Sequence, residues 1–541
     1  MTGLATTFEV LSSTKNEAAV NALVPALESV YPNVQEGSLR AILDRRSVVG
    51  GREIIRRLHT VNERWRTILQ ERRGRLSKVL REGIVGSDEQ MCANSCQAII
   101  SFREYDLMGP LIKAVEDPTH SQSQLMCQTL TALCDLLYEE AMGPRDYAER
   151  RDPQLVRRNV VTLLEQSVGR FGQHKRVETI EAFLTLAGRK NAALRHMLGD
   201  LHHAAYLSLV DVISNSRLAG VMRLLLSFLD DDRPPLATLN IIGRRKDLVF
   251  VRELLAKTGP APSEQTEANL KRIETIAWAS PSVGVLSKLD DEGQHCAVQL
   301  VLASGIARLK AFKTVKYLLQ QGRPGGRRAA AARLAEFQGS EANALAQRAL
   351  DDDDPEVQAN VLRQLRQRGM QGALATLIAK LESPHEAVQQ AARESLPEFR
   401  FERYLAAFES LDEQAQRSTG ALVKRVDPET QPRLVEELGS LMRTRRLRGL
   451  AVVMAMQAAD DFEPQLIELL EDEDHMVRHD AVRALGQCVT STARDALVKA
   501  AGDTSPAVRE AAESALAALP ASQTTANQRD DAAEEGANDA T

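Results

Sequence analysis

Hydrophobic and polar positions follow one another along this chain with the period of an α-helix. In the C-terminal half, an apolar residue stands at an anchor position and small or apolar residues follow four and eight positions later, as in Val508, Ala512 and Leu516. Offsets of four and eight place three side chains along one face of a helix. The pattern therefore predicts a series of short amphipathic helices.

The pattern recurs at a nearly constant interval. Its anchors fall at residues 294, 326, 357, 388, 415, 447, 477 and 508, which are 27 to 32 residues apart, and the units at Ala415 and Leu447 match most weakly. Alanine at the middle position, as at Ala392 and Ala481, suits a site where a neighbouring helix approaches closely. Self-similarity at this interval is typical of proteins built from stacked helical repeats.

Each anchor helix is preceded by residues that start helices, and a second apolar helix follows it. The loops DDDDP at 351–355 and EDED at 471–474 supply capping carboxylates and a proline suited to the first turn. Residues 372–381 and 464–470 are the clearest second helices. Two helices in roughly 31 residues are each too short to be stable alone, so neighbours must stack to bury their apolar faces. We predict an all-α fold, an α-solenoid of stacked antiparallel helix pairs.

The repeat is less regular toward the N-terminus. Anchors at Met91, Leu125 and Val156 continue the series with spacings of 34 and 31 residues. We predict four regions: an arginine-rich N-terminal helical cap over residues 1–84, divergent helical repeats over 85–284, regular repeats over 285–520 and a disordered acidic tail over 521–541. A separate N-terminal helical domain is the alternative.

One unit carries a recognisable repeat signature. Its residues fit the pattern D-x-x-V-R-x-x-A-x-x-A-L-G through Asp474, Val477, Arg478, Ala481, Ala484, Leu485 and Gly486. This resembles the HEAT repeat, in the short form of bacterial HEAT-like proteins of the phycobilin-lyase type, over about residues 285–520. The resemblance implies a solenoid whose surface binds extended peptides or partner proteins.

Composition narrows the class of protein and the compartment. The 541 residues are 43% hydrophobic and only 4% aromatic, and the net charge is −6, so the chain as a whole is no polyanion binder. No secretory signal precedes the first helices, and no apolar run approaches the roughly 20 residues of a membrane span. Six cysteines form no disulfide framework, and we expect a cytoplasmic protein.

The sequence offers little for catalysis, and we predict no catalytic, cofactor-binding or metal-binding residue. Cys92, Cys96, Cys127 and Cys134 could converge on zinc, but buried core cysteines are the simpler interpretation. His475 and His479 resemble one half of a di-iron pair without the repeats needed to complete it, which favours two exposed histidines. No motif of a nucleophile elbow or a phosphate-binding loop is present.

Two arginine clusters are the candidate binding residues. Residues 40–81 hold thirteen Lys or Arg against four acidic residues, and we take from them Arg52, Arg56, Arg57, Arg64 and Trp65 as partner-binding candidates. A solvated capping segment is the alternative. The second cluster, where neighbouring units are acidic, is Arg443, Arg445, Arg446 and Arg448. Its alternative is a charge ladder to residues 471–474 of the next unit.

These observations lead to a hypothesis and two alternatives for function. We expect a non-enzymatic protein–protein interaction scaffold or adaptor, with protein partners whose identity the sequence leaves open. The first alternative is a nucleic-acid binder with a cradle like that of HEAT-like DNA glycosylases. The second is a bilin lyase or chaperone, suggested by the repeat subtype alone.

Overall fold

The computed structural model describes residues 2–144 and 151–518, and all regular structure among them is helical. The chain divides into two compact units, Met1–Arg333 and Leu334–Thr541, each of which is an α-solenoid described here by itself. The predicted all-α solenoid is therefore confirmed. The predicted boundary after residue 284 falls inside the first unit, and the predicted acidic tail lies outside the described residues.

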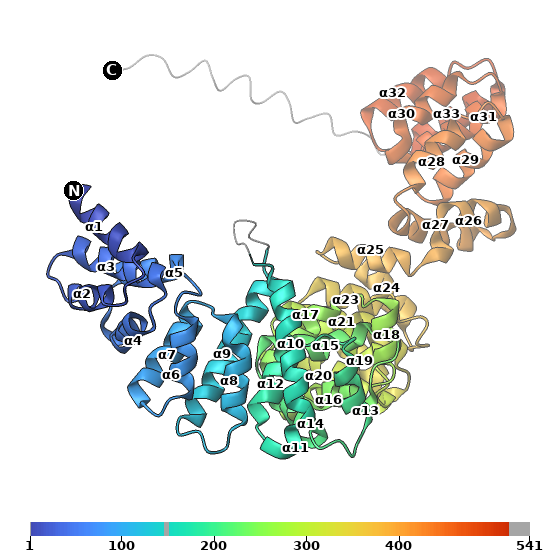
Figure 1. The fold of residues 1–541 in the computed structure, drawn as a ribbon. Helices are drawn as coiled ribbons and strands as arrows, with labels where there is room; N and C mark the ends of the chain where they lie inside the picture. The colour runs from blue at the N-terminus through green and yellow to red at the C-terminus, as the bar shows by residue number, and fades with distance from the viewer. Residues whose placement is uncertain (1, 145–150, 519–541) are drawn as a thin grey trace, which may run out of the picture. The chain divides into compact units, whose positions relative to one another are not determined.

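The helices of the first unit are shown in Figure 1. They are α1 (Thr2–Ser13), α2 (Ala19–Ala26), α3 (Pro32–Arg45), α4 (Val48–Arg56), α5 (Glu63–Glu71), α6 (Ser77–Val85), α7 (Glu89–Ser101), α8 (Met108–Glu116), α9 (Ser123–Met142), α10 (Pro153–Gly169), α11 (Phe171–His174), α12 (Val177–Leu186), α13 (Ala192–Gly199), α14 (Tyr206–Asn215), α15 (Ala219–Ser227), α16 (Leu236–Arg244), α17 (Leu248–Thr258), α18 (Glu264–Leu270), α19 (Asp291–Ala303), α20 (Arg308–Gln321) and α21 (Pro324–Arg333). Short 3-10 helices are η1 (Leu58–Thr60), η2 (Tyr105–Leu107), η3 (Phe228–Asp230), η4 (Ala277–Ala279), η5 (Pro281–Val283) and η6 (Leu286–Lys288).

The second unit continues the alternation of helices. Its members are α22 (Ser340–Ala349), α23 (Pro355–Leu362), α24 (Ala373–Lys380), α25 (Glu386–Glu394), α26 (Phe401–Ala407), α27 (Glu413–Val426), α28 (Thr430–Leu438), α29 (Arg443–Ala455), α30 (Glu463–Glu468), α31 (His475–Leu485), α32 (Ser491–Ala500) and α33 (Pro506–Ala518). The 3-10 helices are η7 (Leu334–Glu336), η8 (Pro397–Phe399), η9 (Phe408–Ser410), η10 (Ala459–Phe462) and η11 (Leu469–Glu471).

In each unit the helices form two rows. In the first unit, α7, α9, α12, α15, α17, α19 and α21 each pack on the next and make the first row, and α6, α8 and α10 run beside them in the second row. Helices α14 and α16 continue the second row. In the second unit, α23 packs on α25, and α27, α29, α31 and α33 pack in succession. Every first-row helix inside a row therefore has neighbours on three sides, and a second-row helix keeps an exposed face.

The anchor positions predicted from the sequence lie where the rows are tightest. Val357, Val388, Val477 and Val508 are fully buried, and each stands in a first-row helix. The glycine anchor of α21, Gly326, marks a close approach, because an added Cβ there would collide with the Gln294 side chain of α19. The 31-residue register over the regular repeats is therefore confirmed.

Two units fit the predicted register less closely. In α27 the buried residues are Gly420, Val423 and Val426, whereas the predicted anchor Ala415 is only half-buried. In α29 the predicted anchor Leu447 is likewise half-buried. These two anchors are therefore less buried than the others, although Leu447 still packs against the core of the second unit and Val423, eight positions after Ala415, is fully buried.

The assignment of the helix at 153–169 to the anchor series was wrong. Helix α10 packs on α8 in the second row, and α12 takes the place beside α9 in the first row. The physical reason is burial: α12 is buried nearly all round, through residues such as Ile180, Phe183 and Leu186. Helix α10 buries a single face. The Asp152–Pro153 start signal marks a helix N-terminus in either row and cannot distinguish them.

Ion pairs connect neighbouring helices across one repeat interval. Arg52 pairs with Glu82 at 2.7 Å, Arg363 with Glu394 at 2.8 Å and Arg478 with Asp503 at 2.8 Å. The first two pairs are exposed and contribute at most about 1 kcal/mol each, whereas the Arg478–Asp503 pair is largely buried. Their regular placement nevertheless neutralises much of the arginine content inside the array.

The length and composition of the helices show whether any of them could span a membrane. No single helix in residues 2–144 or 151–518 is long and apolar enough to cross a bilayer. One pair, Tyr206–Asn215 with Ala219–Asp230, meets the criteria only together and is bent by 104°.

The close approach of the first-row helices can be tested by overpacking. Ala392 of α25 is fully buried at the middle position of its repeat. We expect Ala392→Leu to destabilise the protein by about 1–3 kcal/mol, because a well-packed site cannot accommodate three extra heavy atoms without strain. Denaturant unfolding followed by circular dichroism measures the effect. Gln390→Leu, on the exposed side of the same helix, is the control, and equal midpoints for the two variants would contradict the packing.

Candidate partner-binding groove

The N-terminal arginine candidates already have acidic partners in the structure. Arg52 pairs with Glu82 at 2.7 Å and Arg57 with Glu28 at 2.8 Å. The remaining two pairs are Arg56 with Glu53 and Arg64 with Glu36. Trp65 is 5% exposed and belongs to the core of these helices, so its ring offers almost no surface to a partner.

The second cluster forms ion pairs within its own unit and with the next. Arg443 pairs with Asp474 at 2.8 Å, and Arg446 pairs with Asp472 at 2.7 Å. Arg445 and Arg448 both pair with the buried Glu437, at 2.5 and 2.9 Å. Burial raises the pKa of Glu437, but hydrogen bonds from these two arginines outweigh burial and hold the pKa below its ordinary value.

These contacts correspond to the charge ladder that was the alternative for the second cluster. Cations at the start of α29 oppose the helix dipole, and the carboxylates of the next unit compensate them. The assignment of both clusters to a partner-binding surface stays a prediction. A partner would have to compete with ion pairs that already exist.

The other chemical candidates are cysteines and histidines, and of the cysteines Cys92 and Cys96 lie within hydrogen-bond reach of each other. All six cysteines are buried free thiols, and burial raises the pKa of Cys127 to about 11. His475 is exposed at the start of α31, and His479 lies 3.0 Å from its neighbour Asp480. Within the part of the chain that the structure describes, no group of three or more His, Cys, Asp or Glu residues has the geometry to hold a metal ion.

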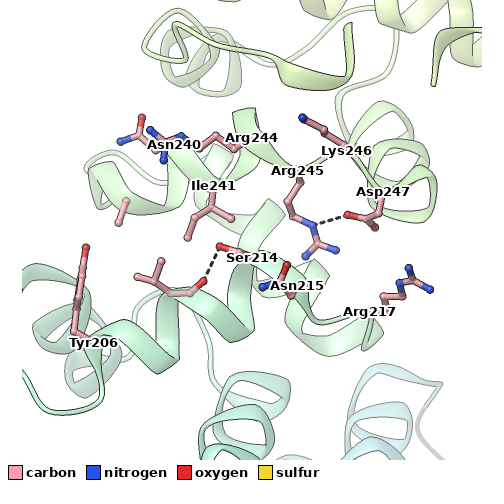
Figure 2. A pocket seen from close by; sticks show the side chains of 12 residues that line it. Tyr206, Ser214, Asn215, Arg217, Asn240, Ile241, Arg244, Arg245, Lys246 and Asp247 are labelled. Carbon is pink, nitrogen blue, oxygen red and sulfur yellow. Dashed lines mark hydrogen bonds and ion pairs between the residues drawn. The ribbon is translucent and has the colours of Figure 1, made fainter. Parts of the chain in front are cut away.

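A groove between two second-row helices is the site that the sequence prediction missed. It has a volume of about 510 Å³ and lies between α14 and α16 of the first unit (Figure 2). Its lining comes from three turns of each helix and from the segments that follow them: Tyr206, Val210, Ser214, Asn215, Arg217, Ala237, Asn240, Ile241, Arg244, Arg245, Lys246 and Asp247. Four of these side chains are cationic and one is a carboxylate.

Arg245 connects the two sides of the groove through hydrogen bonds. Its guanidinium donates to the carbonyl oxygens of Ile213 and Ser216 at 3.0 Å each, and so caps the C-terminal end of α14. It also donates to the Asp247 carboxylate at 2.9 Å and lies 4.4 Å from the ring centroid of Phe250. Arg245 is buried, and its charge is neutralised by Asp247.

Three cations in the lining of the groove are left without such partners, and Figure 2 shows the Arg244 side chain extended toward Asn240. Arg217, Arg244 and Lys246 are exposed, and among residues 2–144 and 151–518 no carboxylate pairs with them and no side-chain hydrogen bond engages them. Because Arg245 already satisfies the end of α14, these three side chains are not needed to cap it. Figure 2 shows Arg217 and Lys246 at the end of the groove opposite Tyr206.

The other end of the groove is apolar. Tyr206 and Val210 of α14 and Ala237 of α16 line it. Leu207 is 79% exposed beside Tyr206, and Leu236 is 65% exposed one turn before Asn240 on the same stripe of α16. Both leucines lie outside the lining itself, as chain neighbours of the lining residues Tyr206 and Ala237. The groove and its border therefore present apolar side chains and uncompensated cations to a ligand.

The equivalent groove of the second unit has the opposite charge. A groove of about 810 Å³ lies between the second-row helices α30 and α32. It is lined by five carboxylates and two cations, in order Glu468, Glu471, Asp472, Arg478, Asp495, Lys499 and Asp503. The same position in the repeat thus carries opposite charge in the two units.

The sequence contained a weak signal for the first groove. The run Arg244–Lys246 separates two apolar helices and carries three consecutive cations. Arg217 lies one repeat interval earlier, in the corresponding loop. Comparing loop charges between units, rather than counting arginines in a window, is the signal that would have found it.

The array of helix pairs defines an α-solenoid, and comparison with known proteins identifies its repeats. The family model for HEAT repeats matches residues 312–397, 342–426 and 463–530. This part of the chain is therefore built of HEAT repeats, and the resemblance predicted from the sequence is confirmed there. Residues 1–311 lie outside the matched segments, and their repeats are defined by helix stacking.

The similarity to solved structures is distant. A chain from a structure of the interaction between cadherin and beta-catenin is 12% identical, with 92% of this chain and 98% of that chain covered and a TM-score of 0.33. Importin beta is 14% identical, with 96% and 78% covered and a TM-score of 0.24. An engineered protein is 16% identical, with 92% and 98% covered and a TM-score of 0.17. Likenesses this distant carry no information about function, and no curated protein matches the sequence.

Arg245 has a structural role that its neighbour Arg244 lacks, and the two residues should therefore differ in their effect on stability. We expect Arg245→Met to destabilise the protein by about 2–4 kcal/mol, because it leaves two buried carbonyls and the Asp247 carboxylate without their donor. Arg244→Met is the matched control, and we expect a change within about 0.5 kcal/mol for this exposed side chain. Thermal and urea unfolding of both variants measure the difference. Similar losses for the two variants would contradict the division of roles.

The pH dependence of this contact has a definite sign. Burial raises the pKa of Asp247, but hydrogen bonds from Arg245 and from the Phe250 amide outweigh burial and hold the pKa below its ordinary value. Stability from a carboxylate whose pKa is lowered by folding is present above its unfolded pKa of about 4 and is lost as the pH falls through the folded value. The difference in unfolding midpoint between the wild type and Asp247→Asn should therefore be constant from pH 7 to 5 and shrink below about pH 4.

Proposed function

We propose that this chain is a cytoplasmic, non-enzymatic protein–protein interaction scaffold or adaptor, and that the groove between α14 and α16 is a docking site for a segment of a partner protein. The observation that supports the proposal most strongly is the charge of the groove. Arg217, Arg244 and Lys246 remain uncompensated in a protein whose other arginine clusters are largely paired with carboxylates.

The groove is suited to a protein ligand. Exposed leucines seldom contact the backbone of a nucleic acid, whereas apolar side chains of a partner protein commonly pack on them. The unpaired cationic side chains line a single groove, and the corresponding groove of the second unit is acidic. A nucleic acid held by its phosphates requires a basic track over several contacts, so this distribution favours a protein.

The hydroxyl groups of the groove favour binding over catalysis. The Ser214 hydroxyl donates to the carbonyl oxygen of Val210 at 2.7 Å, and no histidine lines the groove. Activation of a serine requires an adjacent base in hydrogen-bond reach. The lining of this groove therefore supports recognition of a ligand and not its chemical conversion.

The proposal is tested by comparing two charge-reversal variants of the full chain. The groove variant carries Arg217→Glu, Arg244→Glu and Lys246→Glu. The control carries Lys78→Glu, Lys113→Glu and Lys190→Glu, which reverse three exposed cations elsewhere in the first unit. Both have the same net charge, and circular dichroism checks that both remain folded.

Tagged wild type and both variants are used for affinity capture from nuclease-treated native lysate, with quantitative mass spectrometry. We expect at least one protein to be recovered with the wild type and the control and to be depleted about tenfold or more with the groove variant, which corresponds to a loss of about 1.4 kcal/mol. Recovery that is equal for all three proteins, or that nuclease abolishes, would overturn the proposal.

A further inference from the structure

The two ends of the α14–α16 groove differ in chemistry, and this difference specifies a ligand. Building on the proposed docking function, we propose that the groove binds an acidic and apolar linear segment of a partner protein. Its apolar side chain contacts the leucine end, and its carboxylates contact the cationic end.

Charge complementarity decides the acidic part of the segment. Of the charged side chains lining the groove, Arg245 and Asp247 neutralise one another at 2.9 Å. The remaining three are all cationic, so the groove presents an excess of three positive charges to a ligand. Two of them are guanidinium groups, which bind carboxylates through two parallel hydrogen bonds. Asp and Glu side chains match this end of the groove.

The donors at the cationic end are available for a ligand. An arginine near the end of a helix often bonds to the last carbonyl groups. Here Arg245 bonds to the carbonyls of Ile213 and Ser216, and it is the buried member of the cluster. The flanking Arg244 and Lys246 are exposed and lie in the lining of the groove. A segment can therefore bind them without uncapping α14.

The end of the groove at Tyr206 and Val210 determines the apolar part of the segment. Leu207 and Leu236 are the most exposed apolar residues on α14 and α16, and Tyr206 and Val210 belong to the lining of the groove. Covering this surface removes apolar area from water, which favours binding. A leucine, isoleucine or aromatic side chain of the partner fits this chemistry, whereas a sugar–phosphate backbone does not.

The length of the groove sets the spacing within the segment. Helix α14 has ten residues and therefore spans about 15 Å at 1.5 Å per residue. An extended peptide advances about 3.3 Å per residue. The apolar residue and the acidic residues of the partner should therefore be separated by about four or five positions, if both ends are engaged at once.

The second unit supplies an internal contrast. In the groove between α30 and α32, Glu468, Glu471 and Asp495 are exposed and have no cationic partner among the described residues. An acidic segment would meet like charge there, which disfavours binding. The same segment should therefore distinguish between the two grooves.

A random peptide library tests this inference even while the partner is unidentified. Displayed 12-residue peptides are selected on the full-length wild type and then resynthesised for fluorescence anisotropy with the groove variant and its control. We expect enriched peptides to carry two or more Asp or Glu residues four or five positions from an apolar residue. We expect their affinity to fall about tenfold or more with Arg217→Glu, Arg244→Glu and Lys246→Glu, to remain with the control, and to weaken as salt is added.

Two further variants keep the result interpretable. Leu207→Ser with Leu236→Ser tests the apolar end and should weaken the same peptides several-fold. Arg244→Met removes one exposed cation and serves if the triple variant does not fold, because Arg244 has no partner to lose among the described residues.

The outcomes separate this inference from the proposed function. Peptides that depend on the groove but show no enrichment of acidic residues would overturn the inference and leave the docking function intact. Peptides whose binding is the same for the wild type and the groove variant would overturn both. Binding of a single-stranded thymidine 12-mer to the wild type, lost in the groove variant, would replace the acidic segment by a nucleic acid and also overturn the inference.

Discussion

The structure depends on one constraint, which is that most of the helices in the described residues are too short to be stable without their neighbours. Helices α23 and α25, at the centre of the regular repeats, have eight and nine residues. Isolated helices of that length are unstable in water. They persist because fully buried positions such as Val357, Val388 and Ala392 bring first-row helices into contact along the array.

The same constraint determines which surfaces are free for function. First-row helices are enclosed by two row neighbours and a second-row partner, and they bury nearly every apolar residue. Second-row helices keep an outward face, and grooves form between successive members, as between α14 and α16 and between α30 and α32. The fold therefore repeats a groove between second-row helices, and side chains such as Arg217 or Asp495 make each groove chemically different. In such an array, recognition is a property of individual residues placed on a common backbone.

Much of the fold was predictable because helices that must pack on their neighbours require apolar residues at regular intervals in the sequence. Val477, Ala481 and Leu485 are buried in the structure as their spacing required. The second-row position of α10 was not predictable, since an Asp-Pro start and an apolar stripe occur in helices of either row. The lower burial of the anchors in α27 and α29 was not predictable for a similar reason, because small residues occupy more than one face of these helices.

The candidate site was harder to predict, because charge density along a sequence does not reveal pairing in space. Arg52 and Arg446 stand in dense arginine runs but pair with carboxylates 30 and 26 residues away. Arg217 and Arg244 stand outside those runs and have no carboxylate partner in the described chain. Comparing loop charges between units could have pointed to these residues, but whether a charge is paired in space is established only when the stacking of neighbouring helices is known.

The central claim is that the α14–α16 groove contacts a partner protein, and photo-crosslinking tests it most directly. A benzophenone amino acid is placed at Leu207, which is 79% exposed at the groove, or at Val489, which is 72% exposed in the second unit. We predict that irradiation in cells joins the Leu207 position to a defined protein that the Val489 position does not capture. Equal products from both positions, or crosslinks from Leu207 to nucleic acid alone, would contradict the account.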